Sequence, residues 1–291
     1  MRCQSEWSLL AIGLCGVVAL LARTGVAAQQ PMFKASVDAV RLDVLVTDRG
    51  RVVRGLTAAD FDVLDNRTAQ QLDVVSFEQV PLVVTLAFDL SGSVTGERLD
   101  HLRNAGRAVL DGLRVADQAE LLTFGQRVVR RQDRTGNMAL LRDALDGARP
   151  AGDTSLYDGA FAATMVGESG DGRNLVLLFS DGVDTSSWLS ADQALTSARR
   201  ANVVVYGATV RGGGSTAFLK DLARQTGGDV VEVESTRDLR GRFEAILSEF
   251  RQRYLISYTP RGVERSGWHD VTVRVNGRAL TVRTRPGYQV D

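Results

Sequence analysis

Two carboxylates and three hydroxyl groups are spaced along the chain in a way that could bind a hard metal ion. Asp89, Ser91 and Ser93 occupy alternate positions in FDLSGSVTG. Thr154 follows in RPAGDTSLYDG, and Asp181 follows in LLFSDGVDT. All five side chains offer oxygen, and the set contains neither cysteine nor histidine. This chemistry favours Mg²⁺, Ca²⁺ or Mn²⁺ over zinc or copper.

The composition argues against several other functions. The chain has two histidines, His101 and His269, and two cysteines, Cys3 and Cys15. Zinc sites need clustered ligands and acid–base triads need a placed histidine, and no candidate nucleophile has a base beside it. We therefore expect no enzyme, with both histidines at a surface or an interface. Lys+Arg and Asp+Glu are both 35, so bulk charge predicts no nucleic-acid partner.

The residues between the chain ends predict the scaffold of this site. Between residues 81 and 250, apolar runs such as PLVVTLAFD and NLVLLFSD alternate with helical patterns. Such runs are typical of parallel strands buried on both faces. The alternation predicts an α/β fold with a doubly wound, mostly parallel sheet.

Ligands of such sheets bind where the carboxyl ends of the strands open into loops. Asp89 and Asp181 each follow a predicted strand, and Thr154 stands in a loop, expected to be exposed, just before a helix. We therefore expect the five oxygen donors to converge at one edge of the sheet.

Both ends of the chain alternate apolar and polar residues, as in VDAVRLDVLVTD and HDVTVRV. This period predicts antiparallel strands, with a turn at Asn276–Gly277 between HDVTVRV and ALTVRTR. Neither end is long enough to bury a core alone. We therefore predict that 29–80 and 251–291 pack together as one small β unit flanking an α/β domain of residues 81–250.

Residues 1–28 have the features of a signal peptide. A polar start with Arg2 precedes an apolar run from Trp7 to Ala22, which is shorter than the roughly 20 residues of a membrane-spanning helix. Val26 and Ala28 occupy the small-residue positions of a cleavage site. Cleavage near Ala28 predicts a secreted, periplasmic or cell-envelope protein with no membrane span in its mature chain. The alternative is an uncleaved N-terminal anchor.

At the oxygen-donor positions the chain resembles the von Willebrand factor type A domain. That family carries a metal-ion-dependent adhesion site written D-x-S-x-S, then a threonine, then an aspartate on a later loop. FDLSGSVTG, GDTSLYDG and FSDGVDTS fill all five positions, and LKDLARQTGGDVVEV is similar to a helix–strand passage late in the family. The flanking β segments resemble those of secreted bacterial proteins that hold this domain between short β segments.

The resemblance implies a module that binds proteins through a divalent ion. Ser91, Ser93 and Thr154 would contact Mg²⁺, or Mn²⁺ or Ca²⁺, directly. Asp89 and Asp181 would hold it directly or through water. An Asp or Glu from a protein partner would then complete the octahedral shell.

Two other interpretations of the same residues remain open. A haloacid-dehalogenase-like phosphatase also has an Asp after its first strand, but it needs a second Asp where this chain has Ser91. It also needs a lysine, for which Lys220 is the only candidate in the sheet region. The other interpretation is a scaffold subunit whose metal site is purely structural. D-x-S-x-S alone also occurs in loops, where Asp and Ser cap helices and turns.

Two further features each allow two interpretations. Trp188, after the Asp181 loop, could line a ligand surface or pack against the sheet. Arg130, Arg131 and Arg134 form a basic run that suits a solvated strand edge or the steering of an acidic partner.

Overall fold

The computed structural model describes residues 39–77, 80–168, 172–212 and 216–290. The predicted signal peptide therefore lies outside the described residues. None of the helices in these ranges is long and apolar enough to cross a membrane.

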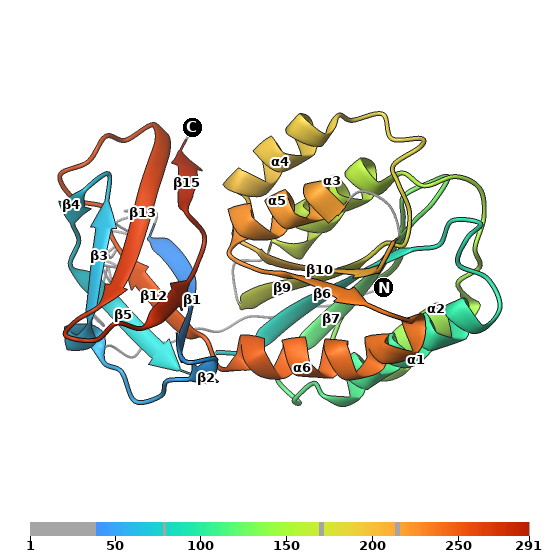
Figure 1. The fold of residues 1–291 in the computed structure, drawn as a ribbon, viewed down its shortest axis with the longest axis horizontal. Helices are drawn as coiled ribbons and strands as arrows, with labels where there is room; N and C mark the ends of the chain where they lie inside the picture. The colour runs from blue at the N-terminus through green and yellow to red at the C-terminus, as the bar shows by residue number, and fades with distance from the viewer. Residues whose placement is uncertain (1–38, 78–79, 169–171, 213–215, 291) are drawn as a thin grey trace, which may run out of the picture. The chain divides into compact units, whose positions relative to one another are not determined.

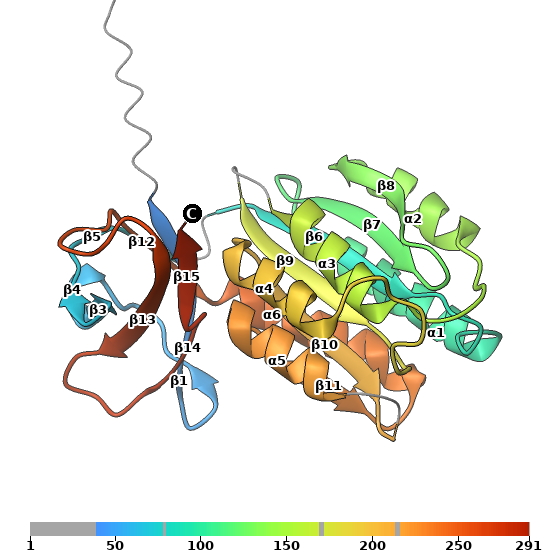
Figure 2. The same cartoon turned by 90° about the horizontal axis from the view of Figure 1, so that it is seen from above.

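A six-stranded sheet with the order β11-β10-β9-β6-β7-β8 forms the centre of the α/β part. Figure 2 shows the strands in this order, from β8 at one edge to β11 at the other. Neighbouring strands are parallel except for the antiparallel pair β7–β8. The predicted doubly wound, mostly parallel sheet is thereby confirmed. The strands are β6 (Leu82–Asp89), β7 (Gln118–Phe124), β8 (Val129–Thr135), β9 (Arg173–Phe179), β10 (Val204–Val210) and β11 (Val230–Val233).

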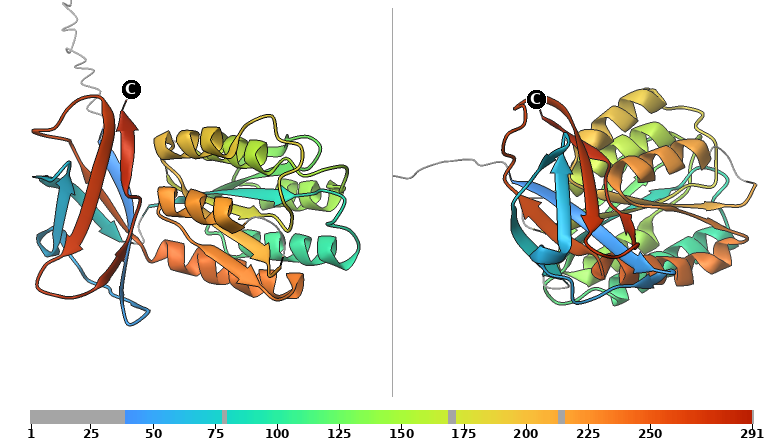
Figure 3. Two further views of the ribbon diagram at one scale, coloured as in Figure 1. Left: turned by 45° about the horizontal axis from the view of Figure 1, so that its top comes forward. Right: turned by 60° about the vertical axis from the view of Figure 1, so that its left-hand side comes forward.

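Helices cover both faces of this sheet (Figures 1 and 3). One face packs against α1 (Glu97–Asp111), α2 (Met138–Gly147) and α6 (Leu239–Arg251). The other packs against α3 (Leu156–Gly167), α4 (Ala191–Arg200) and α5 (Thr216–Thr226). Successive residues of β6 enter opposite cores: Leu86 and Phe88 belong to the first, and Ala87 to the second. Burial on both faces explains why this strand is apolar at every position except Thr85 and Asp89.

Antiparallel strands from the two ends of the chain form two further sheets, ordered β14-β1-β12-β5, with β2 on β1, and β15-β13-β3-β4. β1 pairs with β12, and β3 pairs with β13, so each sheet combines early and late strands (Figure 3). One apolar core draws side chains from both sheets. The elements are β1 (Val40–Asp48), β2 (Arg51–Val52), β3 (Phe61–Asp65), β4 (Thr68–Ala69), β5 (Leu72–Phe77), β12 (Tyr254–Tyr258), β13 (Gly267–Val275), β14 (Thr281–Arg283) and β15 (Gly287–Val290), with short 3₁₀ turns at Ala58–Asp60 and Thr236–Asp238.

The predicted turn at Asn276–Gly277 is confirmed, but the strands on either side of it do not pair with each other. β13 pairs with β3 and β15, while β14 pairs with β1 in the other sheet. The turn residues fix only a reversal of the chain. Both edges of β13 are occupied by other strands, so β14 completes the edge of the second sheet instead.

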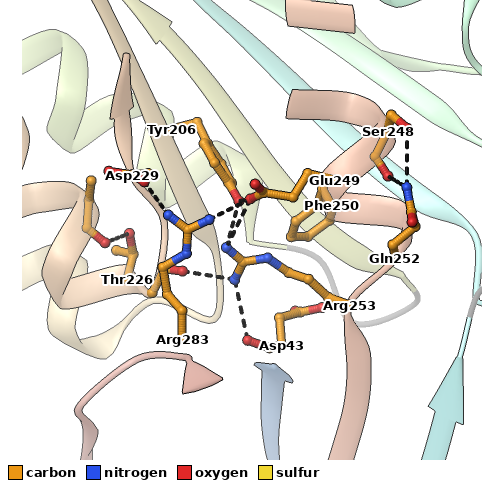
Figure 4. A network of polar contacts seen from close by, with 12 residues as sticks. Asp43, Tyr206, Thr226, Asp229, Ser248, Glu249, Phe250, Gln252, Arg253 and Arg283 are labelled. Atoms are coloured by element: carbon orange, nitrogen blue, oxygen red, sulfur yellow. Dashed lines mark hydrogen bonds and ion pairs between the residues drawn. The ribbon is translucent and has the colours of Figure 1, made fainter. Parts of the chain in front are cut away.

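Buried polar contacts join β1 to the α/β part (Figure 4). Arg173 Nε lies 2.6 Å from Asp43 Oδ1, and the Arg173 side chain is only 1% exposed. Arg253, which is fully buried, donates to Tyr206 Oη at 2.6 Å, to Gly227 O at 2.8 Å and to Asp43 O at 3.3 Å. Burial raises the pKa of Tyr206 to about 12, so its hydroxyl stays neutral and can accept this bond. Both buried guanidinium groups thus have partners inside the protein, as buried charges require.

Candidate metal centre

The predicted site lies where the strand order of the six-stranded sheet reverses. From β6 the chain proceeds to β7 on one side, and later to β9 on the other. Asp89 is the last residue of β6, and Asp181 stands two positions beyond the end of β9. Loops diverge at such a reversal and leave a crevice, which is where open α/β sheets bind ligands.

Hydrogen bonds connect four of the five predicted donors. Asp89 Oδ1 accepts the Ser91 N–H at 2.9 Å. Ser91 Oγ lies 3.1 Å from Ser93 Oγ, and the Ser93 hydroxyl donates to Asp181 Oδ1 at 2.8 Å. The alternate spacing in D-x-S-x-S therefore does bring these side chains together, and it brings them to the later aspartate.

Thr154, the fifth predicted donor, is buried rather than exposed, with 6% of its surface accessible. Its N–H donates to Thr185 Oγ1 at 3.0 Å, and its carbonyl accepts the Thr185 and Ser186 N–H groups. A Cβ placed on Gly182 would lie 3.3 Å from Thr154 Oγ1, so this hydroxyl borders the Asp181 loop. Within the described ranges, the hydroxyl makes no hydrogen bond to another protein group, which leaves it available to a ligand.

Backbone hydrogen bonds fix the loops that carry these donors. Leu90 N–H donates to Phe124 O at 2.6 Å, and Leu90 O accepts the Ala151 N–H at 2.8 Å. Gly92 N–H donates to Gly152 O at 2.9 Å. Gly152 has a φ of +70°, and a Cβ there would lie 2.5 Å from the Cβ of Gln126. A side chain at position 152 would therefore disturb the loop that presents Thr154.

The electrostatics of the site favour a cation. Burial raises the pKa of Asp89, and the nearby Asp181 charge adds to this effect, while hydrogen bonds from Ser180 and Ser91 partly oppose it. The Ser180 hydroxyl donates to Asp89 Oδ2 at 2.7 Å, a contact that the sequence analysis missed. A bound cation would offset the cost of holding two carboxylates here.

The donor set fits a hard divalent ion because every member is a carboxylate or hydroxyl oxygen. No three His, Cys, Asp or Glu side chains cluster as metal ligands among the residues that the structure describes. The candidate set has only two carboxylates, and its other three members are hydroxyl groups, so it would not form such a cluster. We call Asp89, Ser91, Ser93, Thr154 and Asp181 the candidate metal centre.

Arg98, in the first turn of α1, also reaches this site. Its Nη1 lies 3.1 Å from Asp181 Oδ2, and the Arg98 side chain is 56% exposed. Sequence spacing gave no signal for this ion pair, because it depends on how α1 packs beside the Asp181 loop. The guanidinium partly neutralises Asp181, so it opposes the binding of a second cation there.

An Arg98→Gln substitution should therefore raise the affinity for Mg²⁺ by about two- to fivefold, the range of an exposed ion pair. Titration calorimetry of the purified chain measures the change. Arg240→Gln removes the same charge from the exposed Arg240–Glu244 pair of α6 and should leave the affinity unaltered. Equal affinities in the natural and Arg98→Gln chains would contradict the opposing role of Arg98.

Trp188 lies on the surface and does not pack against the sheet. It is 96% exposed, and Val183 on the same connection is 54% exposed. The loop itself is well held, because Asp158 accepts the N–H groups of Trp188 and Leu189 at 3.0 and 2.9 Å. The Asp181 loop thus presents apolar side chains on a fixed backbone.

The residues that could support other chemistry lie elsewhere. Lys220 on α5 pairs with Glu232 at 2.9 Å, on a strand separated from β6 by β10 and β9. His101 lies 2.9 Å from the Thr236 hydroxyl. His269 is buried beside Asp65 at 2.8 Å, so its expected place at a surface or interface is wrong.

Comparisons with known proteins agree with this architecture. Residues 84–245 match the von Willebrand factor type A domain family. A mussel byssus protein, proximal thread matrix protein 1 with a zinc-occupied MIDAS motif, aligns with a TM-score of 0.55 and 18% identity, covering 64% of this chain and 49% of its own. This chain therefore spans about half the length of the mussel protein.

A bacterial structure is also similar. The von Willebrand factor type A protein from Catenulispora acidiphila aligns with a TM-score of 0.54 and 12% identity, over 79% of this chain and 73% of its own. No curated protein sequence gives a significant match. At these identities the structural likeness concerns the fold, while the family match covers more than half of the chain. The chain therefore belongs to the von Willebrand factor type A domain family.

Proposed function

We propose that this chain is an exported, bacterial-type adhesion module that binds a protein partner through a divalent ion at the candidate metal centre. Type A domains typically serve in adhesion and protein interaction, and the MIDAS named for the mussel structure supports a metal at this position of the fold. Export follows from the predicted signal peptide and its cleavage near Ala28. Mg²⁺ is the proposed ion, with Mn²⁺ or Ca²⁺ as substitutes.

The residues of the centre have separate tasks in this proposal. Ser91, Ser93 and Thr154 offer hydroxyl oxygens to the ion, and Asp181 balances its charge. Asp89 orients the loop by accepting the Ser91 N–H and supplies the second negative charge. A divalent ion held mainly by neutral ligands supplies an electrophilic centre that can exchange a water for a carboxylate of a protein partner.

One observation carries the proposal: side-chain oxygens of Ser91, Ser93 and Asp181 are joined by successive hydrogen bonds at the point where the strand order reverses. The Thr154 hydroxyl, without a protein partner in the described ranges, borders the same loop. Trp188 and Val183, exposed on the connection that follows Asp181, add apolar area of the kind that anchors protein interfaces.

Affinity capture from an extract of the cell envelope tests the proposal. The immobilised chain should retain a protein in Mg²⁺ and release it in EDTA. A Ser93→Ala chain should not retain it, because the substitution removes one oxygen of the centre. Ser248→Ala, on α6 and outside the centre, is the matched control and should retain it. Retention that survives both EDTA and Ser93→Ala would contradict the proposal.

The two alternatives predict different results. A phosphatase would hydrolyse a phosphate ester, with Asp89 as nucleophile, yet Ser91 replaces the second Asp and Lys220 is bound to Glu232. We expect no hydrolysis. A purely structural metal would stabilise the fold without making partner retention sensitive to Ser93→Ala. A rise in melting temperature with Mg²⁺ but no captured protein would favour that alternative.

A further inference from the structure

A groove of about 260 Å³ opens beside the candidate metal centre. Its walls come from the β7–β8 connection, from the α2–α3 connection and from Leu90, which stands between Asp89 and Ser91 in the sequence. The two connections also position Thr154, because Ser155 donates its N–H and its hydroxyl to Gly125 O at 3.1 and 2.6 Å. The groove and the metal centre are therefore held by the same loops.

Three exposed arginines, Arg127, Arg131 and Arg149, line this groove, which we call the arginine groove. Arg131 Nε donates to the neutral Thr123 hydroxyl at 2.9 Å, and Arg149 donates to the backbone carbonyls of Asp146 and Ala148. In the part of the chain that the structure describes, none of the three pairs with a carboxylate. No Asp or Glu lines the groove either.

Arg130, the neighbour of Arg131 on β8, differs in having carboxylate partners. Arg130 lies 2.6 Å from Glu120 and 3.1 Å from Asp133. Adjacent strand residues point to opposite faces, so Arg130 reaches the acidic pair while Arg131 lines the groove. Within the basic run, Arg130 is therefore paired with carboxylates, whereas the charge of Arg131 is left for a ligand.

We propose that the arginine groove binds acidic residues that flank the metal-bound carboxylate of the partner, so that the partner presents an acidic segment rather than a single Asp or Glu. This inference rests on the proposed function, since the metal centre anchors the segment beside the groove. Guanidinium groups recognise carboxylates with paired N–H···O bonds. Three unpaired cations would also accelerate the approach of an acidic partner.

The chain as a whole favours an acidic peptide over a nucleic acid as the occupant. Its formal net charge is zero, so bulk charge does not draw it to a phosphate backbone. The arginine groove itself has a volume of about 260 Å³, which suits a few side chains of a peptide. A single-stranded oligonucleotide still serves as a competing probe in the test.

The experiment compares two capped, fluorescent peptides on the full purified chain by anisotropy. One peptide carries a single glutamate among glycines and serines, and the other carries four consecutive glutamates. In Mg²⁺ and low salt, the acidic peptide should bind about tenfold more tightly than the single-glutamate peptide, as expected for two weak surface pairs. High salt should reduce this advantage.

An Arg127→Gln/Arg131→Gln chain should lose the advantage while binding the single-glutamate peptide and Mg²⁺ normally. Arg149 is left in place because its bonds to backbone carbonyls support the end of α2. Arg134→Gln is the matched control, since Arg134 is exposed on the same strand but does not line the groove. The control should keep the full advantage.

The outcomes separate the groove from the metal site. If peptide binding needs Mg²⁺ but the double variant still prefers the acidic peptide, the proposed role of the arginine groove is overturned and the proposed metal function is not. Binding that needs the arginines but survives EDTA supports the groove and overturns the proposed metal function. An oligonucleotide that binds more tightly than the acidic peptide, and is lost in the double variant, overturns the acidic-segment assignment. Failure of both peptides to bind counts against both proposals.

Discussion

An Asp89→Asn chain should bind Mg²⁺ at least about 100-fold more weakly than the natural chain, which is the upper end of the cost of losing a supporting partner at a metal site. The substitution removes one of the two negative charges at the centre. The asparagine oxygen can still accept the Ser91 N–H, and its amide can donate to the Ser180 hydroxyl once that hydroxyl rotates. The loop geometry should therefore persist.

The same substitution should leave the metal-free protein equally stable or more stable at neutral pH. Burial raises the folded-state pKa of Asp89, so the ionised carboxylate opposes folding. That cost is absent below the ordinary carboxyl pKa and is complete once the pH has risen past the raised pKa. Asparagine removes it, which gives a melting temperature at or above that of the natural chain in EDTA.

Titration calorimetry and thermal unfolding measure both effects on the same samples. Asp153→Asn is the matched control, since Asp153 is an exposed carboxylate one position before Thr154. It should change the Mg²⁺ affinity by no more than about twofold, as for a weakly coupled surface charge. Equal Mg²⁺ binding by the natural and Asp89→Asn chains would remove the basis for the site assignment.

An Asp43→Ala chain should lose about 3–5 kcal/mol of unfolding free energy, the usual cost of breaking a buried ion pair. Arg173, 1% exposed, would keep its bond to Phe250 O but would have no carboxylate at its Nε. The total unfolding free energy of a domain is roughly 5–15 kcal/mol, so this loss should lower the urea midpoint strongly.

Urea unfolding followed by circular dichroism measures this change. Glu244→Ala removes a carboxylate from the exposed Arg240–Glu244 pair and should cost no more than about 0.5 kcal/mol, as surface substitutions do. If the two variants unfold at the same urea concentration, the Arg173–Asp43 contact between β1 and the α/β part does not stabilise the fold.

The elements of the α/β part could be predicted because each carries a local signal. β6 and β9 are mostly apolar, since both faces of each strand are buried. The start of α4 is marked by Ser190 and Gln193, whose side chains bond to each other's backbone N–H groups at 3.3 and 2.9 Å. Such signals depend on spacing of a few residues, which a sequence displays directly.

Strand partners in the β unit could not be predicted in the same way. Period two shows which face of β13 is buried, with Val271, Val273 and Val275 directed inward, but not which strands lie beside it. The choice of β3 and β15 over β14 depends on contacts between distant parts of the chain. Tertiary packing therefore decides which strands pair on either side of the Asn276–Gly277 turn.

The candidate site was likewise predictable in part. Asp89 and Asp181 could be assigned to one sheet edge because each follows a buried strand. The contacts of Arg98 and Ser180 depend on side chains meeting between elements, and the burial of Thr154 depends on the loop at Thr185. Arg173 and Arg253 are buried although arginine is mostly exposed in proteins, and no local pattern distinguishes them.

The pairing of β1 with β12 has a consequence for the folding of a chain that emerges N-terminus first, from the ribosome or from a membrane channel. Arg253 bonds to Asp43, 210 residues earlier, so the first strands emerge long before their partners. The strands of the α/β part find their neighbours within the intervening segment, so this part can fold while the chain is still emerging. Until Tyr254 and the strands after it have emerged, β1 and β3 each keep an unpaired edge that invites association with other chains. In a chain that folds as it emerges, the two end sheets close last.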